Sequence, residues 1–289
     1  MKIILPLQLL WSLGSVGLMA SRSISITALL VMVLSFFFMF YQILKTKYFS
    51  NPYQALKKIE QSYKTPPPTQ QKSWKSPLDQ QCGRGDAQLR KKLLAMQLII
   101  KQIKPHQTNY GLRLQKDLFN QQLDPTPSLI ILHETVYDLE SAVNTLLTPH
   151  PSDSDQVSYH TLVARNGEII QLVQPELRAY GAGNSAFNGR WIFSNKDLSG
   201  SINNFALHVS LETPIDGSND FESHGGYSSQ QYDSLTRVLA DWMVRYEIPA
   251  DRITTHKFVD LGGERSDPRS FDWKQLQKRL GALDLICKK

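Results

Sequence analysis

Apolar and polar positions follow clear periods only in the second half of the chain. Residues 128–133 (SLIILH) form a short apolar run ending in a histidine, which predicts a buried strand that opens at one edge. YHTLVA and IIQLV, on either side of an Asn-Gly pair, predict a hairpin. Residues 204–212 alternate with period two, which predicts a strand with two different faces. One face carries Phe205, Leu207, Val209 and Leu211, and the other carries Ala206, His208, Ser210 and Glu212.

Helical periods flank these strands. Residues 228–249 predict a helix that Pro249 ends, with a buried stripe of Tyr232, Leu235, Leu239 and Trp242. Residues 251–256 (DRITTH) predict a brief strand or loop before His256, and residues 87–103 (AQLRKKLLAMQLIIKQI) predict an amphipathic helix. The combination predicts an α/β domain with a central mixed sheet flanked by helices.

The N-terminal region differs from this domain. Residues 25–44 contain no charge and are long enough to cross about 30 Å of hydrocarbon, which predicts a membrane anchor. Residues 3–20 are also apolar, and they form either a second span or part of a long signal anchor. The residues that follow, 49–86, are rich in proline, glutamine and lysine, a composition typical of an extended tether. The predicted divisions are an anchor of one or two spans (1–48), the tether (49–86), a helix and connector (87–127), the α/β domain (128–282) and a tail (283–289).

Charge is divided between the two halves of the chain. Residues 1–127 carry 17 Lys+Arg against 5 Asp+Glu, and residues 128–289 carry 15 against 21, which together give the net charge of +6. The folded part therefore lacks the basic excess that nucleic-acid binding requires, and we expect no nucleic-acid partner. The lysines after the apolar segment favour a cytoplasmic position for the domain by the positive-inside rule. The two cysteines, Cys82 and Cys287, could pair in an oxidising compartment, and the sequence leaves this open.

Three potential metal ligands stand at predicted strand or loop ends: His133, His256 and Asp267. The last two begin and close the loop within TTHKFVDLGGERSDPR, residues 254–269. Two neutral imidazoles and a carboxylate suit Zn²⁺ with a fourth position left for water. Their spacing alone is not specific, because it lacks the pair of histidines one helical turn apart that marks many zinc sites.

Six segments in the same order make residues 129–280 resemble the zinc-dependent N-acetylmuramoyl-L-alanine amidases. That family includes cytosolic muropeptide amidases, phage lysozyme-type amidases and peptidoglycan recognition proteins. The segments are IILHET, VSYHTLVARNGEIIQLV, RAYGAGNSAFNG, NNFALHVSLE, YSSQQYDSLTRVLADWMVRY and ITTHKFVDLGGERSDP. The resemblance implies that His133, His256 and Asp267 bind zinc. It also implies hydrolysis of the amide between N-acetylmuramic acid and L-alanine in peptidoglycan or its fragments.

The chain departs from the family pattern in ways that bear on catalysis. Ser210 stands where many cellular amidases have a glutamate base, and Glu212, two residues on, is either its substitute or a capping carboxylate. Tyr159 matches a functional tyrosine of the phage-type enzymes, with a packed hairpin tyrosine as the alternative. Arg265 replaces a lysine and would stabilise negative charge without donating a proton. His208 replaces a small residue, and Gly181 stands where relatives often have histidine.

We therefore predict a zinc amidase with Tyr159, Arg265 and Glu212 as catalytic residues. The N-terminal helix would tether it to the membrane, with the domain on the periplasmic or extracytoplasmic face. Its partner would be peptidoglycan or muropeptides. Two alternatives stay open: a binding module of the same fold that does not cleave, which the loss of the strand glutamate favours, and cytosolic muropeptide recycling, which the positive-inside rule favours.

Overall fold

The structure, a computed structural model, describes residues 31, 33–42, 68, 71, 73–78, 86–218 and 221–286. Contacts divide the chain into two units, Met1–Gln61 and Ser62–Lys289. In the first unit, residues 33–42 are helical. Among the described residues, no helix is both long and apolar enough to cross a membrane. Most of the predicted anchor and tether lies outside these residues, as do both cysteines, so those expectations stay predictions.

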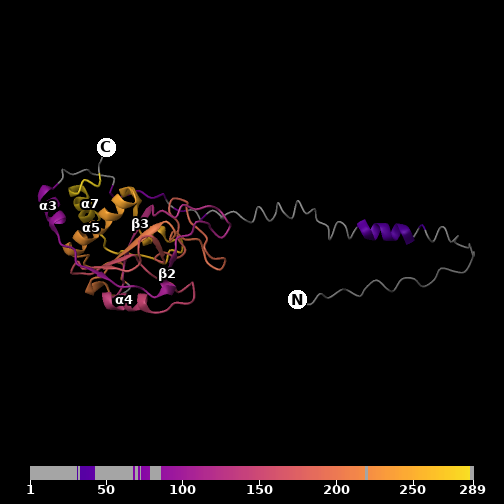
Figure 1. Ribbon diagram of the computed structural model, residues 1–289, viewed down its shortest axis with the longest axis horizontal. Coiled ribbons are helices and arrows are strands. Elements are labelled where there is room, and N and C mark those ends of the chain that lie inside the picture. The colour runs from indigo at the N-terminus through magenta and orange to yellow at the C-terminus, as the bar shows by residue number, and fades with distance from the viewer. Residues whose placement is uncertain are drawn as a thin grey trace, which may run out of the picture. The chain divides into compact units, whose positions relative to one another are not determined.

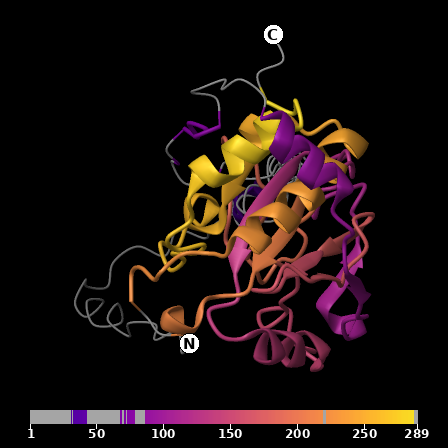
Figure 2. The same ribbon diagram turned by 90° about the vertical axis from the view of Figure 1, so that its left-hand side faces the viewer.

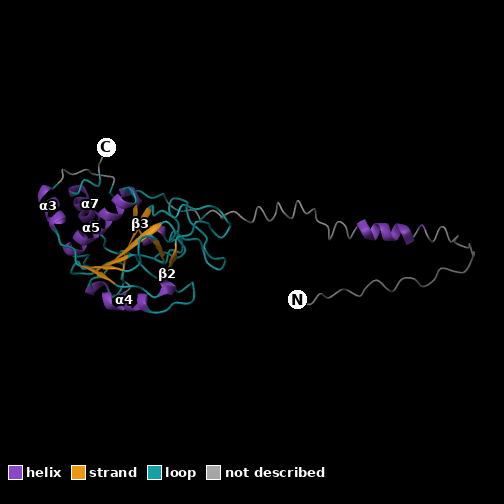
Figure 3. Cartoon of the chain, viewed as in Figure 1, coloured by secondary structure: helices purple, strands orange, loops and turns teal. Residues whose placement is uncertain are grey.

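The second unit is built on a six-stranded mixed sheet (Figures 1 and 3) with the order β1-β5-β4-β7-β3-β8. Only β4 and β5 pair antiparallel, as the hairpin prediction requires, and the other neighbours are parallel. The strands are β1 (Ile100–Gln102), β3 (Leu129–Glu134), β4 (Thr161–Val163), β5 (Ile169–Gln171), β7 (Ala206–Leu211) and β8 (Ile253–Thr255). A smaller antiparallel sheet joins β2 (Tyr110–Leu112) to β6 (Leu177–Ala179). The predicted mixed α/β fold is confirmed.

Three helices lie together on one face of the large sheet (Figure 2): α3 (Ala87–Ala95), α5 (Ser229–Arg245) and α7 (Trp273–Ala282). Ser228 and Gln231 form a capping box that begins α5. The four residues of its predicted apolar stripe are all buried, which confirms the helical period. Leu235, Leu239 and Trp242 belong to the main core together with Ile130, Leu132, Leu207 and Val209. Tyr232 contacts Phe271, which packs on this core.

The other face of the sheet is covered by α4 (Leu139–Leu147), by the loops of residues 180–205 and by α6 (His256–Val259). Leu129, Ile131 and Ala206 pack there. Because side chains alternate across a strand, His133, His208 and Ser210 belong to this loop-covered face, whereas Glu134 belongs to the face of α5 and α7. Among the described residues of this unit, three short segments form 3₁₀ helices: η1 (Gln107–Asn109), η2 (Ile215–Gly217) and η3 (Ala250–Arg252).

One expected helix is shorter than its apolar period suggested. The segment 87–103 is helical only as far as Ala95, and Ile100–Gln102 forms the edge strand β1, parallel to β5. β-branched residues such as isoleucine fit a strand better than a helix. Pairing with β5 then supplies the backbone hydrogen bonds that a longer helix would have made. β1 and β2 thus come from the expected connector but pair with strands of the domain.

Candidate metal centre

The three predicted metal ligands come together at the carboxyl end of β3. His133 is the fifth residue of β3, and the register of β3 with β8 places Leu132 opposite Thr255. His256 follows Thr255 as the first residue of α6, so it lies beside His133. The Lys257 N–H donates to the Asp267 carbonyl over 2.9 Å, which ties the closing end of the loop to its beginning. The loop of residues 257–266 thus returns a carboxylate to the two histidines.

The geometry of this trio is that of a donor set around a common point. Asp267 Oδ2 lies 3.2 Å from His133 Nδ1, and Asp267 Oδ1 lies 3.0 Å from His256 Nδ1. One ligand atom from each residue lies within 4.8 Å of the others, and all three residues are buried. The imidazole centroids of His133 and His256 are 4.6 Å apart. These residues could hold a metal ion.

The pKa values of His133 and Asp267 are both shifted toward the protonation states that a metal requires. Desolvation lowers the pKa of His133 to about 4, so its imidazole is neutral at pH 7. Burial by itself would raise the pKa of Asp267, but its contacts with His133 and His256 hold that pKa well below its usual range. A neutral imidazole at His133 and an ionised carboxylate at Asp267 match ligand types that Zn²⁺ takes in hydrolytic sites.

Tyr159 lies next to the trio, as the sequence predicted. Its ring is 4.9 Å from that of His133, centroid to centroid, with the two planes at 47°. Burial, followed by the negative charge of Asp267, raises the pKa of Tyr159 above its usual value. The hydroxyl therefore stays protonated at neutral pH and is available to donate a hydrogen bond.

Arg265 occupies an exposed turn at the edge of the site. The Asp260 carboxylate organises this turn by accepting from the backbone N–H groups of Gly262, Glu264 and Arg265. Burial has the largest effect on the pKa of His133, and the positive charge of Arg265 is among the smaller influences that lower it further. Its charge thus acts on the site, although its side chain is open to solvent.

Glu212 is engaged in contacts outside the trio. Its Oε1 accepts from the Leu139 N–H at the start of α4, and its Oε2 accepts from the Arg165 N–H over 2.8 Å. The Arg165 guanidinium adds an ion pair at 3.2 Å. These are the contacts of a capping and pairing carboxylate, the alternative that the sequence left open. They argue against the predicted catalytic assignment of Glu212, because a base needs a free oxygen directed at the reacting proton.

A Glu212→Gln variant separates the two roles. A capping role predicts turnover within about twofold of the original chain and a loss of about 1–3 kcal/mol in the free energy of unfolding, because an amide cannot replace every accepted bond. A base would instead show turnover reduced by about 10²–10⁴-fold. Steady-state kinetics and denaturant unfolding on the same preparation measure both quantities.

Glu134 is a buried carboxylate that sequence reasoning missed, although it directly follows His133. It forms an ion pair with Arg269, accepts a 2.6 Å hydrogen bond from the Tyr227 hydroxyl and lies 3.0 Å from His224 Nε2. Arg269 also donates to the carbonyls of Gly217 and Phe221. This network fixes the residues that flank both His133 and Asp267. The only sign of this role in the sequence was a charged residue directly after the apolar run that ends in His133.

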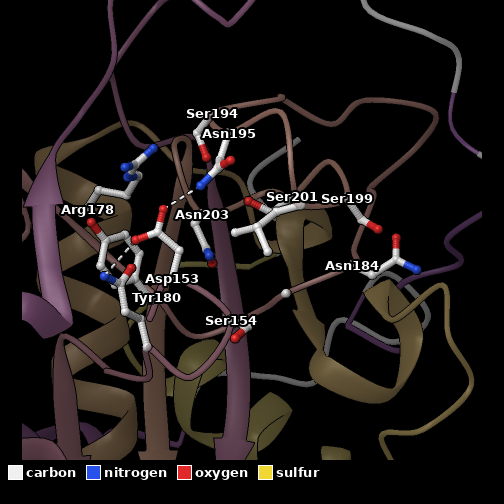
Figure 4. A pocket seen from close by; sticks show the side chains of 13 residues that line it. Asp153, Ser154, Arg178, Tyr180, Asn184, Ser194, Asn195, Ser199, Ser201 and Asn203 are labelled. Atoms are coloured by element: carbon white, nitrogen blue, oxygen red, sulfur yellow. Dashed lines mark hydrogen bonds between the residues drawn. The ribbon is translucent and has the colours of Figure 1, made fainter. Parts of the chain in front are cut away.

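A polar cavity of about 320 Å³ adjoins the loop-covered face (Figure 4). The Arg178 guanidinium lies over the Tyr180 ring at 5.2 Å, and Asn195 donates a hydrogen bond to Asp153 on the cavity wall. Segment 180–184, part of this wall, also runs beside the ligand loop, where the Leu261 N–H donates to the Asn184 carbonyl. The cavity offers hydrogen-bonding groups and one guanidinium to a polar ligand.

Comparisons with known proteins identify the family of this chain. Residues 123–270, which are 148 of the 289, match the Amidase_2 family, described as N-acetylmuramoyl-L-alanine amidase. The chain therefore belongs to the N-acetylmuramoyl-L-alanine amidase family. The predicted resemblance is confirmed at the level of the family.

Two relatives are named 1,6-anhydro-N-acetylmuramyl-L-alanine amidase AmpD. The one from Citrobacter freundii is 32% identical over 124 residues, and the one from Haemophilus influenzae is 36% identical over 123 residues. Each alignment covers 42% of this chain and 56% of the relative, so the chain spans little more than half the length of these curated relatives. A crystal structure of a selenomethionine AmpD derivative is 22% identical with a TM-score of 0.45, covering 63% of this chain and 98% of that one.

Proposed function

We propose that this chain is a zinc-dependent amidase that hydrolyses the amide between N-acetylmuramic acid and L-alanine in peptidoglycan or its fragments. The observation that carries the proposal is the convergence of His133, His256 and Asp267 at the end of β3. Membership of the amidase family supports the reaction. The relatives named as 1,6-anhydro-N-acetylmuramyl-L-alanine amidases support a muropeptide as substrate.

The donor set fits zinc, and three such donors would leave a fourth coordination position for water. Both Nδ1 atoms face one carboxylate, and burial keeps His133 neutral. Zinc bound there would supply Lewis acidity and lower the pKa of water. The chain's own residues would hold the scissile carbonyl in place, stabilise the charge that develops on its oxygen and exclude bulk solvent.

Tyr159 and Arg265 would stabilise this developing charge. The Tyr159 hydroxyl stays protonated, so it can donate a hydrogen bond to the carbonyl oxygen as that oxygen becomes negative. Arg265 would add a permanent positive charge from the exposed rim of the site without transferring a proton. The polar part of the substrate would lie in the cavity beside Arg178 and Tyr180.

The direct test measures bond cleavage by the full chain. Purified peptidoglycan and soluble muropeptides are incubated with the protein in zinc and, separately, in excess chelator. Mass spectrometry then follows peptides that begin with L-alanine. Release in zinc that stops in chelator supports the proposal. A folded, zinc-loaded chain that binds the wall but releases no peptide would instead favour the non-catalytic binding module, in line with Ser210 at the position of the strand glutamate.

Tyr159→Phe is expected to lower kcat by about 10²–10³-fold, the usual effect of removing one donor to an oxyanion. Zinc affinity and the melting temperature are expected to change little, because the ring still packs on His133. Tyr137→Phe, which alters an exposed tyrosine that follows strand β3, is the control. Equal kcat values for the two variants would show that Tyr159 only packs.

We further propose that the apolar N-terminal segment tethers the enzyme to a membrane, with the domain on the extracytoplasmic side. The uncharged run of residues 25–44 supports the tether, and a substrate in the cell wall supports the side. Reporter domains fused to the C-terminus test the side. A reporter active only in the cytoplasm would overturn this placement and favour muropeptide recycling.

A further inference from the structure

His208 on β7 lies against the metal ligand His133. The register of β7 with β3 places His208 opposite Ile131 and Ser210 opposite His133. His208 is fully buried, and its Nδ1 lies 3.0 Å from His133 Nε2. The two ring centroids are 5.2 Å apart, with the planes at 42°. His133 thus has Asp267 at one ring nitrogen and His208 at the other.

Proton positions in this pair follow from the role of His133. A neutral imidazole carries one N–H and one acceptor nitrogen. When Nδ1 of His133 is the metal ligand, its proton is on Nε2 and points at His208 Nδ1. A metal-binding histidine usually donates this second N–H to a carboxylate, a backbone carbonyl or water. Here an imidazole stands in that place.

The backbone of His208 is fixed by a third histidine. The His208 N–H donates to His160 Nδ1 over 2.9 Å, and the His160 N–H donates to the His208 carbonyl over 2.9 Å. His160 Nδ1 is therefore an acceptor, so its proton is on Nε2, which donates to the Leu177 carbonyl. The His160 and His208 rings lie nearly parallel, with planes at 5°. His160 thus fixes the backbone of His208, while the His208 ring contacts the proposed metal ligand His133.

Gly181 makes room for the His208 ring. A Cβ atom at position 181 would lie 2.4 Å from His208 Nδ1 and 2.6 Å from Cγ, distances that side-chain carbons essentially never adopt, and 3.0 Å from Cε1. The closest atoms all belong to His208. Glycine at 181 and histidine at 208 are therefore sterically matched, and both positions depart from the pattern of the amidases that the sequence resembles.

Packing alone does not account for a histidine here. Within the part of the chain that the structure describes, His208 Nε2 has no hydrogen-bond partner, and a buried polar atom without one costs free energy. The ring's polar side-chain contact is the one with His133. An apolar side chain of similar size would fill the space at lower cost.

We propose that His208 is a positioning residue that accepts the His133 Nε2–H, fixes the orientation of that ligand and strengthens its hold on zinc, and that Gly181 provides the space for it. This inference rests on the proposed zinc site. It assigns to the strand β7 a role that the family pattern, with its small residue at this position, does not supply.

The test compares His208→Leu with His208→Asn. The two side chains have similar size and shape, but the Asn Oδ1 can accept a hydrogen bond near the position of Nδ1 and Leu cannot. Competition with a chromophoric chelator measures the zinc affinity of the full chain. We expect about a 10–100-fold loss for His208→Leu, the usual effect of removing a partner of a metal ligand, and partial recovery in His208→Asn. The metal-free melting temperature of His208→Leu should not fall.

A second variant pair tests the match with Gly181. Gly181→Ala is expected to weaken zinc binding in the original chain but to add no further loss in a His208→Ala background, because the overlapping ring is then gone. In the ¹⁵N imidazole spectrum of the zinc form, His208 is expected as the Nε2–H tautomer.

The possible failures are distinguishable. An original chain that binds no zinc would overturn the metal site itself, and this inference with it. Equal zinc affinity in the original chain and in His208→Leu would overturn the positioning role while leaving the metal site standing. An additional loss from Gly181→Ala in the His208→Ala background would overturn the steric match.

Discussion

His133→Ala is expected to abolish stoichiometric zinc binding and to lower amidase activity by on the order of 10³-fold or more, because a catalytic metal contributes several kcal/mol to the transition state. His133 is the central member of the trio: it contacts Asp267 directly, and its ring packs on both His256 and Tyr159. Its removal leaves two ligands, too few to hold zinc in a tetrahedral site.

Zinc content by elemental analysis and peptide release by mass spectrometry measure the two effects. His106→Ala, which alters a partly buried histidine outside the site, is the control and should keep both properties. The metal-free melting temperatures of both variants show whether they fold. A folded His133→Ala chain that retains one zinc ion and its activity would contradict the proposed metal centre.

Arg269→Ala is expected to produce the largest loss of stability, about 3–5 kcal/mol, because it leaves the buried Glu134 carboxylate without its cation. Glu134 is 2% exposed and Arg269 is 6% exposed, so solvent cannot replace the lost partner. The change also removes the donors to the carbonyls of Gly217 and Phe221. Because Glu134 follows His133 and Arg269 lies two residues after Asp267, weaker zinc binding should accompany the loss.

Denaturant unfolding of the metal-free chain measures this cost without the contribution of zinc. Arg245→Ala is the matched control, since its pair with Asp241 is about half exposed and should contribute no more than about 0.5 kcal/mol. Arg269→Lys keeps the charge but loses the planar fork, so we expect it to recover only part of the stability. A loss of stability for Arg269→Ala no larger than that for Arg245→Ala would show that another group compensates the charge of the Glu134 carboxylate.

The local sequence pattern was sufficient to predict several elements of the domain. Strand β3, the β4–β5 hairpin and helix α5 lie where period and turn chemistry predicted them. Each depends on neighbours in sequence: an unbroken apolar run, an Asn-Gly turn, and a stripe at helical spacing behind a capping box. The candidate ligand trio follows from the family resemblance over six segments and not from the spacing of its three residues.

Contacts between residues far apart in sequence decided the remainder. Residues 100–102 form a strand because their backbone pairs with the edge of β5. Glu212 became a cap and ion-pair partner because α4 and Arg165 lie beside the end of β7.

The pairs Glu134–Arg269 and Gly181–His208 join residues separated by 135 and 27 positions. No local period encodes such pairings, since they depend on which strand ends and loops the packed sheet brings together. The sequence by itself determined β3, the β4–β5 hairpin and α5, and its family resemblance indicated the candidate ligands, whereas the tertiary structure decided which side chains surround those candidates.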